Sequence, residues 1–129
     1  MIPNPYKFEL DQIKFLGTSG QNVDNIRKYS NVGPSSLDIL DKTLQWCHIS
    51  PTAPDTCRSF PTIEMDPLFF KEIPNVYFAG NQDSFETKLS FYNGVPLRLI
   101  AIPDFSKTFS FVLMDMNTLE ACEYQIEMN

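Results

Sequence analysis

Short apolar runs separated by turn residues fill the second half of the chain, and this pattern is typical of a protein built on strands. Val76-Tyr77-Phe78-Ala79 is unbroken, as in a strand buried on both faces. Leu89 and Phe91 alternate with polar residues up to Asn93-Gly94, a dipeptide that favours a type I′ hairpin turn, and an apolar run returns from 97 to 102. We therefore expect a buried strand followed by a hairpin.

Two further strands are expected at the end of the sequence. The segment 108–114 is apolar on both alternating sets of residues, so we expect it to lie inside a sheet. From 122 to 127, apolar residues alternate with Glu and Gln, which predicts a strand with one face in water.

The first part of the chain adds strands and helices. Tyr6–Leu10 and Ile13–Leu16 read as two short strands around a turn. A helix is expected from Val23 to Tyr29, with Asn22 as its cap. A second helix is expected from Ser36 to Trp46, because its leucines recur at spacings of three and four. The fold class predicted is α+β: an antiparallel-rich sheet with helices on one side.

Composition limits the class of protein further. A length of 129 residues with 43% apolar content suits one folded domain. No window approaches 18 consecutive apolar residues, and the N-terminus lacks the pattern of a signal peptide, so we expect a soluble chain with no membrane partner. The net charge of −6 opposes a phosphate-tracking surface, so no direct nucleic-acid binding is expected of this chain alone.

The cysteines do not indicate a metal or disulfide framework. Cys47, Cys57 and Cys122 contain no CxxC pair, and zinc binding with His48 as fourth ligand is disfavoured by their spacing. The neighbours Cys47 and His48 favour a core cysteine and a hydrogen-bonded histidine over a nucleophile and its base. Reduced thiols and no cofactor are expected.

Gly17-Thr18-Ser19-Gly20 after the second strand is the strongest candidate for a binding loop. A phosphate-binding loop at a helix N-terminus is one interpretation. The segment lacks the Lys and the spacing of a P-loop, which favours a backbone loop that leads into the helix.

The run Gly17-Thr18-Ser19-Gly20-Gln21-Asn22, the Pro-bracketed segment 48–56 and Val76–Asn81 together resemble the C-terminal part of the small (B) accessory subunits of eukaryotic DNA polymerase delta. Segments 66–70 and 102–106 extend the resemblance over nearly all 129 residues. It implies a calcineurin-like phosphoesterase sandwich whose catalytic residues have been replaced. Because the family's subunit is several times longer, residues 1–129 would be a single domain or fragment, the C-terminal portion of that phosphoesterase-like domain.

The resemblance also implies which residues stand at the lost catalytic positions. Active relatives carry His-Gly after one strand and Gly-His-x-His after a later one. The first histidine falls at Ser19, before Gly20, and the later motif becomes Gly80-Asn81-Gln82-Asp83. A serine hydroxyl and an asparagine amide do not replace imidazole as metal ligands. Ser19, Gly20, Asn81, Gln82 and Asp83 would thus be degenerate phosphoesterase positions, with no catalytic residue and no metal ligand.

The implied function is a noncatalytic scaffold of the polymerase delta complex in the nucleus, active in DNA replication and repair. The family bridges the C-terminal domain of the catalytic subunit to a further accessory subunit. Two alternatives remain open: a residual metallophosphoesterase or nuclease half, and the small subunit of polymerase alpha or epsilon. A single-stranded DNA binding module is disfavoured, because the acidic chain offers no basic aromatic groove.

Overall fold

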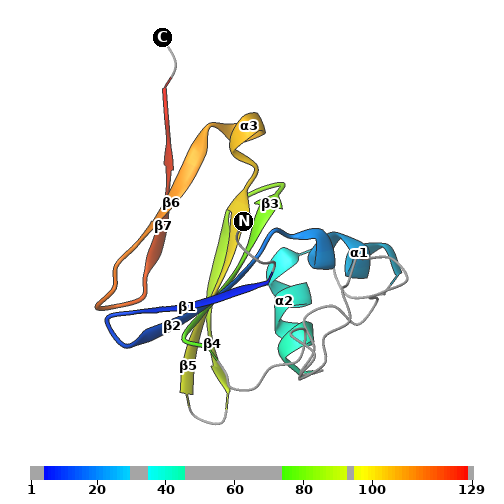
Figure 1. The fold of residues 1–129 in the computed structure, drawn as a ribbon. Helices are drawn as coiled ribbons and strands as arrows, with labels where there is room; N and C mark the ends of the chain where they lie inside the picture. The colour runs from blue at the N-terminus through cyan, green and yellow to red at the C-terminus, as the bar shows by residue number, and fades with distance from the viewer. Residues whose placement is uncertain (1–4, 30–34, 46–73, 93–94, 128–129) are drawn as a thin grey trace.

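The computed structural model describes residues 5–29, 35–45, 74–92 and 95–127. Within them a five-stranded sheet lies between a pair of helices and a two-stranded hairpin (Figure 1). The expected α+β class is confirmed. Cys47, His48, Cys57 and Trp46 lie outside the described residues. No helix in the described part of the chain is long and apolar enough to cross a membrane.

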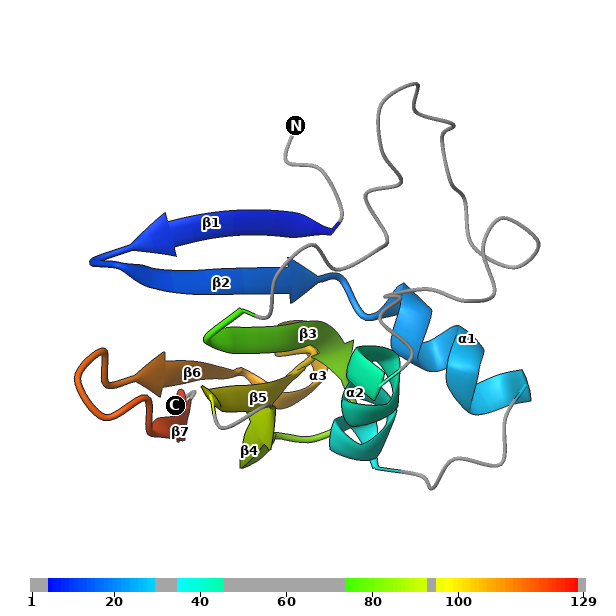
Figure 2. The same cartoon turned by 90° about the horizontal axis from the view of Figure 1, so that it is seen from below.

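The five-stranded sheet has the order β1-β2-β3-β5-β4. β1 pairs antiparallel with β2, and β4 with β5, whereas β3 runs parallel to both β2 and β5. The sheet is therefore mixed, with antiparallel pairs at its edges and parallel pairs at its centre, which Figure 2 shows from below. Its strands are β1 (Tyr6–Leu10), β2 (Ile13–Thr18), β3 (Val76–Gln82), β4 (Glu86–Tyr92) and β5 (Val95–Pro103).

Two helices, α1 (Gln21–Tyr29) and α2 (Ser36–Gln45), pack on one face of this sheet. Every second residue of the central strands points toward them, so that Leu16, Tyr77 and Leu99 join the helices' apolar faces in one buried cluster. The helices contribute Val23, Ile26, Leu37, Ile39, Leu40 and Leu44. The predicted helices are confirmed, and both lie on one side as expected.

Tyr77 anchors this layer. Its ring is fully buried, and its hydroxyl lies 3.0 Å from Thr43 Oγ1 on α2. Since Thr43 Oγ1 donates to the carbonyl of Leu40, its oxygen is available to accept from the tyrosine. Burial raises the pKa of Tyr77 to about 12, because the phenolate would have to form without water around it.

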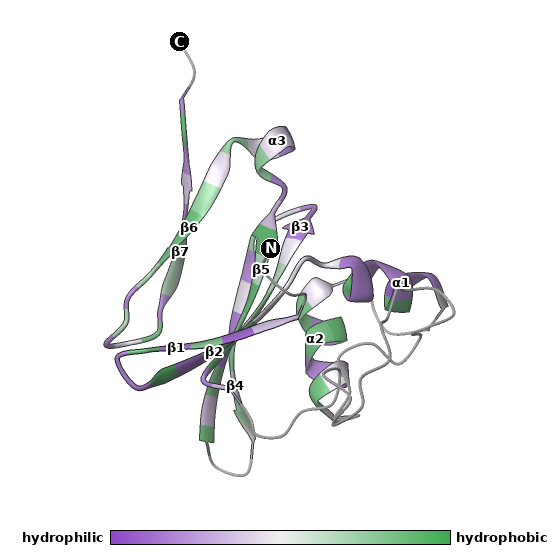
Figure 3. Cartoon of the chain, in the orientation of Figure 1, coloured by the Kyte–Doolittle hydropathy of each residue, from purple (hydrophilic) through white to green (hydrophobic). Residues whose placement is uncertain are grey.

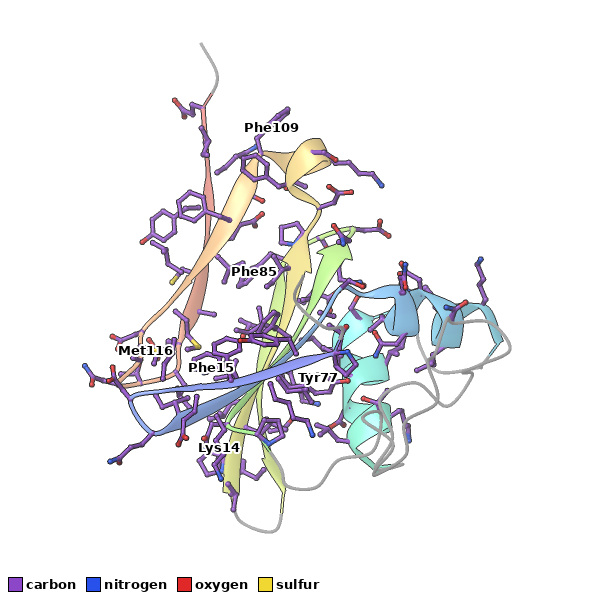
Figure 4. All side chains as sticks on the ribbon, viewed as in Figure 1. Lys14, Phe15, Tyr77, Phe85, Phe109 and Met116 are labelled. Carbon is purple, nitrogen blue, oxygen red and sulfur yellow. The ribbon has the colours of Figure 1, made fainter. Side chains whose placement is uncertain are left out.

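The opposite face of the sheet is covered by the hairpin of β6 (Ser110–Met114) and β7 (Ala121–Gln125). Phe15, Val76 and Ile100 form the centre of this second cluster. Val112, Met114, Met116, Leu119 and Ala121 pack against it from the hairpin side. Figure 4 shows Phe15 and Phe85 between the sheet and the hairpin, with Met116 near the hairpin turn. Arg98 ties the two layers together, since its Nε donates to the carbonyl of Leu119 at 2.6 Å.

Several sequence expectations are corrected by the structure. α1 begins at Gln21 rather than Val23, and Gly20 instead of Asn22 stands at the cap position, because its carbonyl accepts from Asp24 N at 3.1 Å. β3 continues through Gly80 to Gln82 with a register shift after Ala79. The segment 108–114 does not lie inside a sheet, since in the described structure β6 pairs only with β7.

A short helix, α3 (Phe105–Thr108), was not expected from the sequence. Asp104 begins it by accepting from Ser106 N at 3.0 Å and from Ser106 Oγ at 2.7 Å. These bonds from Ser106 hold the pKa of the Asp104 carboxyl below its usual value. Phe109 ends the helix in the left-handed conformation at φ 52°. Four residues are too few to produce a helical apolar repeat that the sequence could reveal.

Candidate functional site at the carboxyl ends of β2 and β3

The parallel pairing of β2 and β3 brings the two sequence motifs together. Thr18 is paired with Ala79, so both strands reach their carboxyl ends at the same edge of the sheet. Asn81 Nδ2 donates to the carbonyl of Ser19 at 3.0 Å, across 62 residues of sequence. Asn81 has a positive φ of 56°, a conformation that Asn tolerates better than most residues. Asn81 therefore departs from ordinary strand conformation, although β3 continues to Gln82.

Gly20 is the point of closest approach between the two segments. Its φ is +96°, and a Cβ at this position would lie 2.1 Å from the carbonyl oxygen of Gly80 and 2.5 Å from Gln82 Nε2. Only glycine allows this approach without strain. Thr18 Oγ1 accepts from Gly20 N at 3.1 Å and donates to Asn22 Oδ1 at 2.8 Å, which fixes the turn into α1.

Behind this contact lies a group of hydrogen-bonded side chains that we call the polar junction: Arg27 of α1, Ser36 of α2 and Gln82 of β3. Ser36 Oγ donates to Gln82 Oε1 at 2.7 Å, and Arg27 donates to Ser36 Oγ at 2.8 Å. Gln82 Nε2 donates to the carbonyl of Gly80 at 2.9 Å. Gln82 and Ser36 are both buried, so the bond between them joins α2 to the end of β3 with little access for water.

A known protein family covers this part of the chain. Residues 1–87 match the family model for the B subunit of DNA polymerases alpha and epsilon. The chain belongs to the DNA polymerase alpha/epsilon B-subunit family. Both halves of the candidate site, after β2 and after β3, fall inside the matched region.

Within this B-subunit family, the chain is similar to delta small subunits. The chain is 44% identical to the DNA polymerase delta small subunit of Arabidopsis thaliana, over 91% of this chain and 27% of the relative. It is 44% identical to DNA polymerase delta subunit 2 of Drosophila melanogaster, over 92% of this chain and 28% of the relative. The small subunit of Saccharomyces cerevisiae is 32% identical, over 99% of this chain and 31% of the relative. The expected resemblance to delta small subunits is confirmed, and the chain spans less than a third of the length of these relatives.

In this member of the B-subunit family, the polar groups at the strand ends are engaged with one another. Ser19 contributes its carbonyl to Asn81, and Gln82 is engaged in neutral hydrogen bonds. Asp83 is exposed just beyond them. Among the described residues, no group of three or more His, Cys, Asp or Glu side chains comes together. A hollow of about 230 Å³ lies elsewhere, beside β1 and β2, and its lining includes Lys7, Phe15 and Pro74.

Sequence reasoning missed Arg27 and Ser36. Arg27 lies beside the exposed Lys28 in α1, yet its Nε is buried and has no hydrogen-bond partner within the described residues. Its terminal nitrogens bond to Ser36 and, at 3.2 Å, to Asp24. One signal was present in the sequence. Arg27 follows the buried Val23 by four residues, which places both on the same side of the helix.

Proposed function

We propose that this chain is part of a noncatalytic accessory subunit of the DNA polymerase delta complex, acting in the nucleus in DNA replication and repair. The observation that carries the proposal is the polar junction in a member of the B-subunit family. The neutral Gln82 stands at the end of β3 and bonds to Ser36, and the close approach of Gly20 to Gly80 constrains the backbone after β2. Two-metal phosphoester chemistry needs several His, Asp and Asn ligands that converge on two cations. A site filled by hydrogen-bonded Gln and Ser side chains serves to hold secondary structure in place.

The finer structural assignments belong to the same proposal. Residues 1–129 would be the C-terminal portion of a calcineurin-like phosphoesterase domain. Ser19, Gly20, Asn81, Gln82 and Asp83 would stand where an active relative places its ligand motifs. The contact between Ser19 and Asn81 supports this, because the two positions come from separate motifs and meet in space.

The partners would be the C-terminal domain of the catalytic subunit and a further accessory subunit. The delta names of the relatives support delta over alpha or epsilon. The acidic balance of the chain supports an assembly role without direct DNA contact, since counterion release from DNA requires clustered Lys and Arg.

An exchange experiment tests this function. The matched segment of the Arabidopsis delta small subunit is replaced by this chain, and the chimera is co-expressed with the catalytic subunit of polymerase delta. We expect the chimera to co-purify with it at one-to-one stoichiometry and to be absent from parallel preparations with the alpha and epsilon catalytic subunits. The unmodified Arabidopsis subunit is the positive control, and the same subunit without the segment is the negative one. A folded chimera that fails to bind where the unmodified subunit binds would overturn the proposal.

A further inference from the structure

The hairpin of β6 and β7 has one packed face and one uncovered face. Val112, Met114 and Ala121 turn inward onto the five-stranded sheet. The residues that alternate with them turn away from it, as the period of a strand requires. Phe111 is 40% exposed, Leu113 52% and Tyr124 51%. We call this surface the outer hairpin face; it consists of Phe109, Phe111, Leu113, Cys122, Tyr124 and Ile126.

The side chains of the outer hairpin face lie next to one another and form one continuous surface. Phe111 stacks on Tyr124 across the strand pair, with ring centroids 6.1 Å apart. Leu113 is paired with Cys122, which is exposed. Beyond the strand pair, Ile126 N donates to the carbonyl of Phe109 at 2.8 Å, so the same register continues. Figure 3 shows the hydrophobic residues along β6.

The area is large enough to hold a partner. An aromatic side chain presents roughly 150–250 Å² when fully exposed, so the three aromatic side chains and the three smaller ones of this face, each about half exposed, together amount to about 500 Å². That is near the upper end of the largest apolar patch on a monomer, and well over half of the ~800 Å² that one partner contributes to a standard interface. A two-stranded sheet is also marginal by itself and gains from further cover.

A second copy of this chain fits the face poorly. The segment 104–127 carries five carboxylates and one lysine. Asp115, Glu120, Glu123 and Glu127 are all exposed. Asp115 and Glu120 lie at the hairpin turn, whereas Glu123 is paired with the inward-facing Val112. Two copies packed face to face would still bring two chains of net charge −6 together, which costs free energy. The complementary occupant has an apolar centre with Lys or Arg beside it.

The relatives indicate where such an occupant comes from. In the three similar delta small subunits, 27% to 31% of the length corresponds to this chain, so more than two thirds has no counterpart in it. We propose that the outer hairpin face binds a segment of the small subunit from outside these 129 residues, with apolar side chains at its centre and basic ones at its rim. The inference rests on family membership and is independent of the proposed bridging of other subunits.

Cys122 provides a direct readout. The chain is co-expressed with the Arabidopsis delta small subunit from which the matched segment has been deleted, as two separate polypeptides. The complex is then treated with iodoacetamide, and alkylation is followed at the Cys122 peptide by mass spectrometry. We expect the two polypeptides to co-purify and the alkylation rate of Cys122 to fall at least tenfold relative to the chain alone.

A matched pair of variants locates the contact. Leu113→Asp adds a charge in the outer hairpin face and should weaken co-purification at least tenfold. Phe91→Asp adds the same charge at a residue of β4 that is 65% exposed, and should leave co-purification unchanged. The alkylation rate of Cys122 is measured on the unmodified chain, so it tests the proposed contact even if Leu113→Asp does not fold.

Three results would overturn the inference. The polypeptides could fail to co-purify. They could co-purify while Cys122 keeps the reactivity that it has in the chain alone, in which case they meet elsewhere. The chain alone could form a dimer in which Cys122 is protected, and the occupant would then be a second copy. Because no catalytic subunit is present, none of these results bears on the bridging function.

Discussion

Gly20→Ala should lower the free energy of unfolding by about 3 kcal/mol. A residue with a side chain pays roughly 1–3 kcal/mol in an unfavourable backbone region, and overpacking adds a similar amount. Both apply here, because Gly20 has a φ of +96° and its added Cβ would meet the backbone oxygen of Gly80 at 2.1 Å. Backbone yields less readily than the end of a flexible side chain. Thermal unfolding should show a midpoint lowered by roughly 10 °C.

Gly80→Ala is the matched control, since it makes the same chemical change on the other side of the contact. A Cβ there would lie 3.7 Å from the carbonyl oxygen of Thr18, at ordinary van der Waals distance. We expect a change of less than about 1 kcal/mol, the general cost or gain of exchanging Gly and Ala. Equal effects of the two substitutions would contradict the close approach at Gly20.

Gln82→Met should lower the free energy of unfolding by about 2–4 kcal/mol. Methionine keeps the length and unbranched shape of glutamine but removes the acceptor for Ser36 Oγ and the donor to the carbonyl of Gly80. Each buried polar group left without a partner costs roughly 1–3 kcal/mol. Urea unfolding measures the change, with an unaltered slope if the folded and unfolded states keep their exposed areas.

Asp83→Ala serves as the control for Gln82→Met. Asp83 is the next residue along the chain and is exposed. Its replacement should alter stability by no more than about 0.5 kcal/mol, as is usual for surface positions. If Asp83→Ala were the more damaging change, the polar junction would not be the element that joins the helices to β3.

The sequence predicted strands and helices correctly where apolar residues repeat regularly within one segment. Leu40 and Leu44 mark the buried side of α2, and the alternation from Tyr6 to Leu10 marks β1. The β6 prediction was wrong for a physical reason. Apolar residues on both faces of a strand indicate that both faces can be buried, but they do not reveal which segment buries each face. In the described structure one side packs on the sheet, and the other forms the outer hairpin face.

The candidate site could be predicted only in part. The sequence favoured a backbone loop at Gly17–Gly20 that leads into the helix, and Gly20 has a positive φ there. The contact of Ser19 with Asn81 depends on β2 and β3 running parallel across more than fifty residues of intervening chain, which no local pattern encodes. The pairing of Arg27 with Ser36 likewise joins two helices whose packing is set by the sheet beneath them.

We propose that the ends of β2 and β3 form a structural junction without phosphoester chemistry. The most direct measurement is hydrolysis of a phosphodiester substrate in the presence of Mn²⁺, by the chain alone and by its co-expressed complex with the remainder of the Arabidopsis subunit. We expect turnover equal to the metal-only background in both, and also after histidine is introduced together at Ser19, Asn81 and Asp83, because two-metal catalysis needs further ligands. Turnover above background that Asp83→Ala abolishes would contradict the claim.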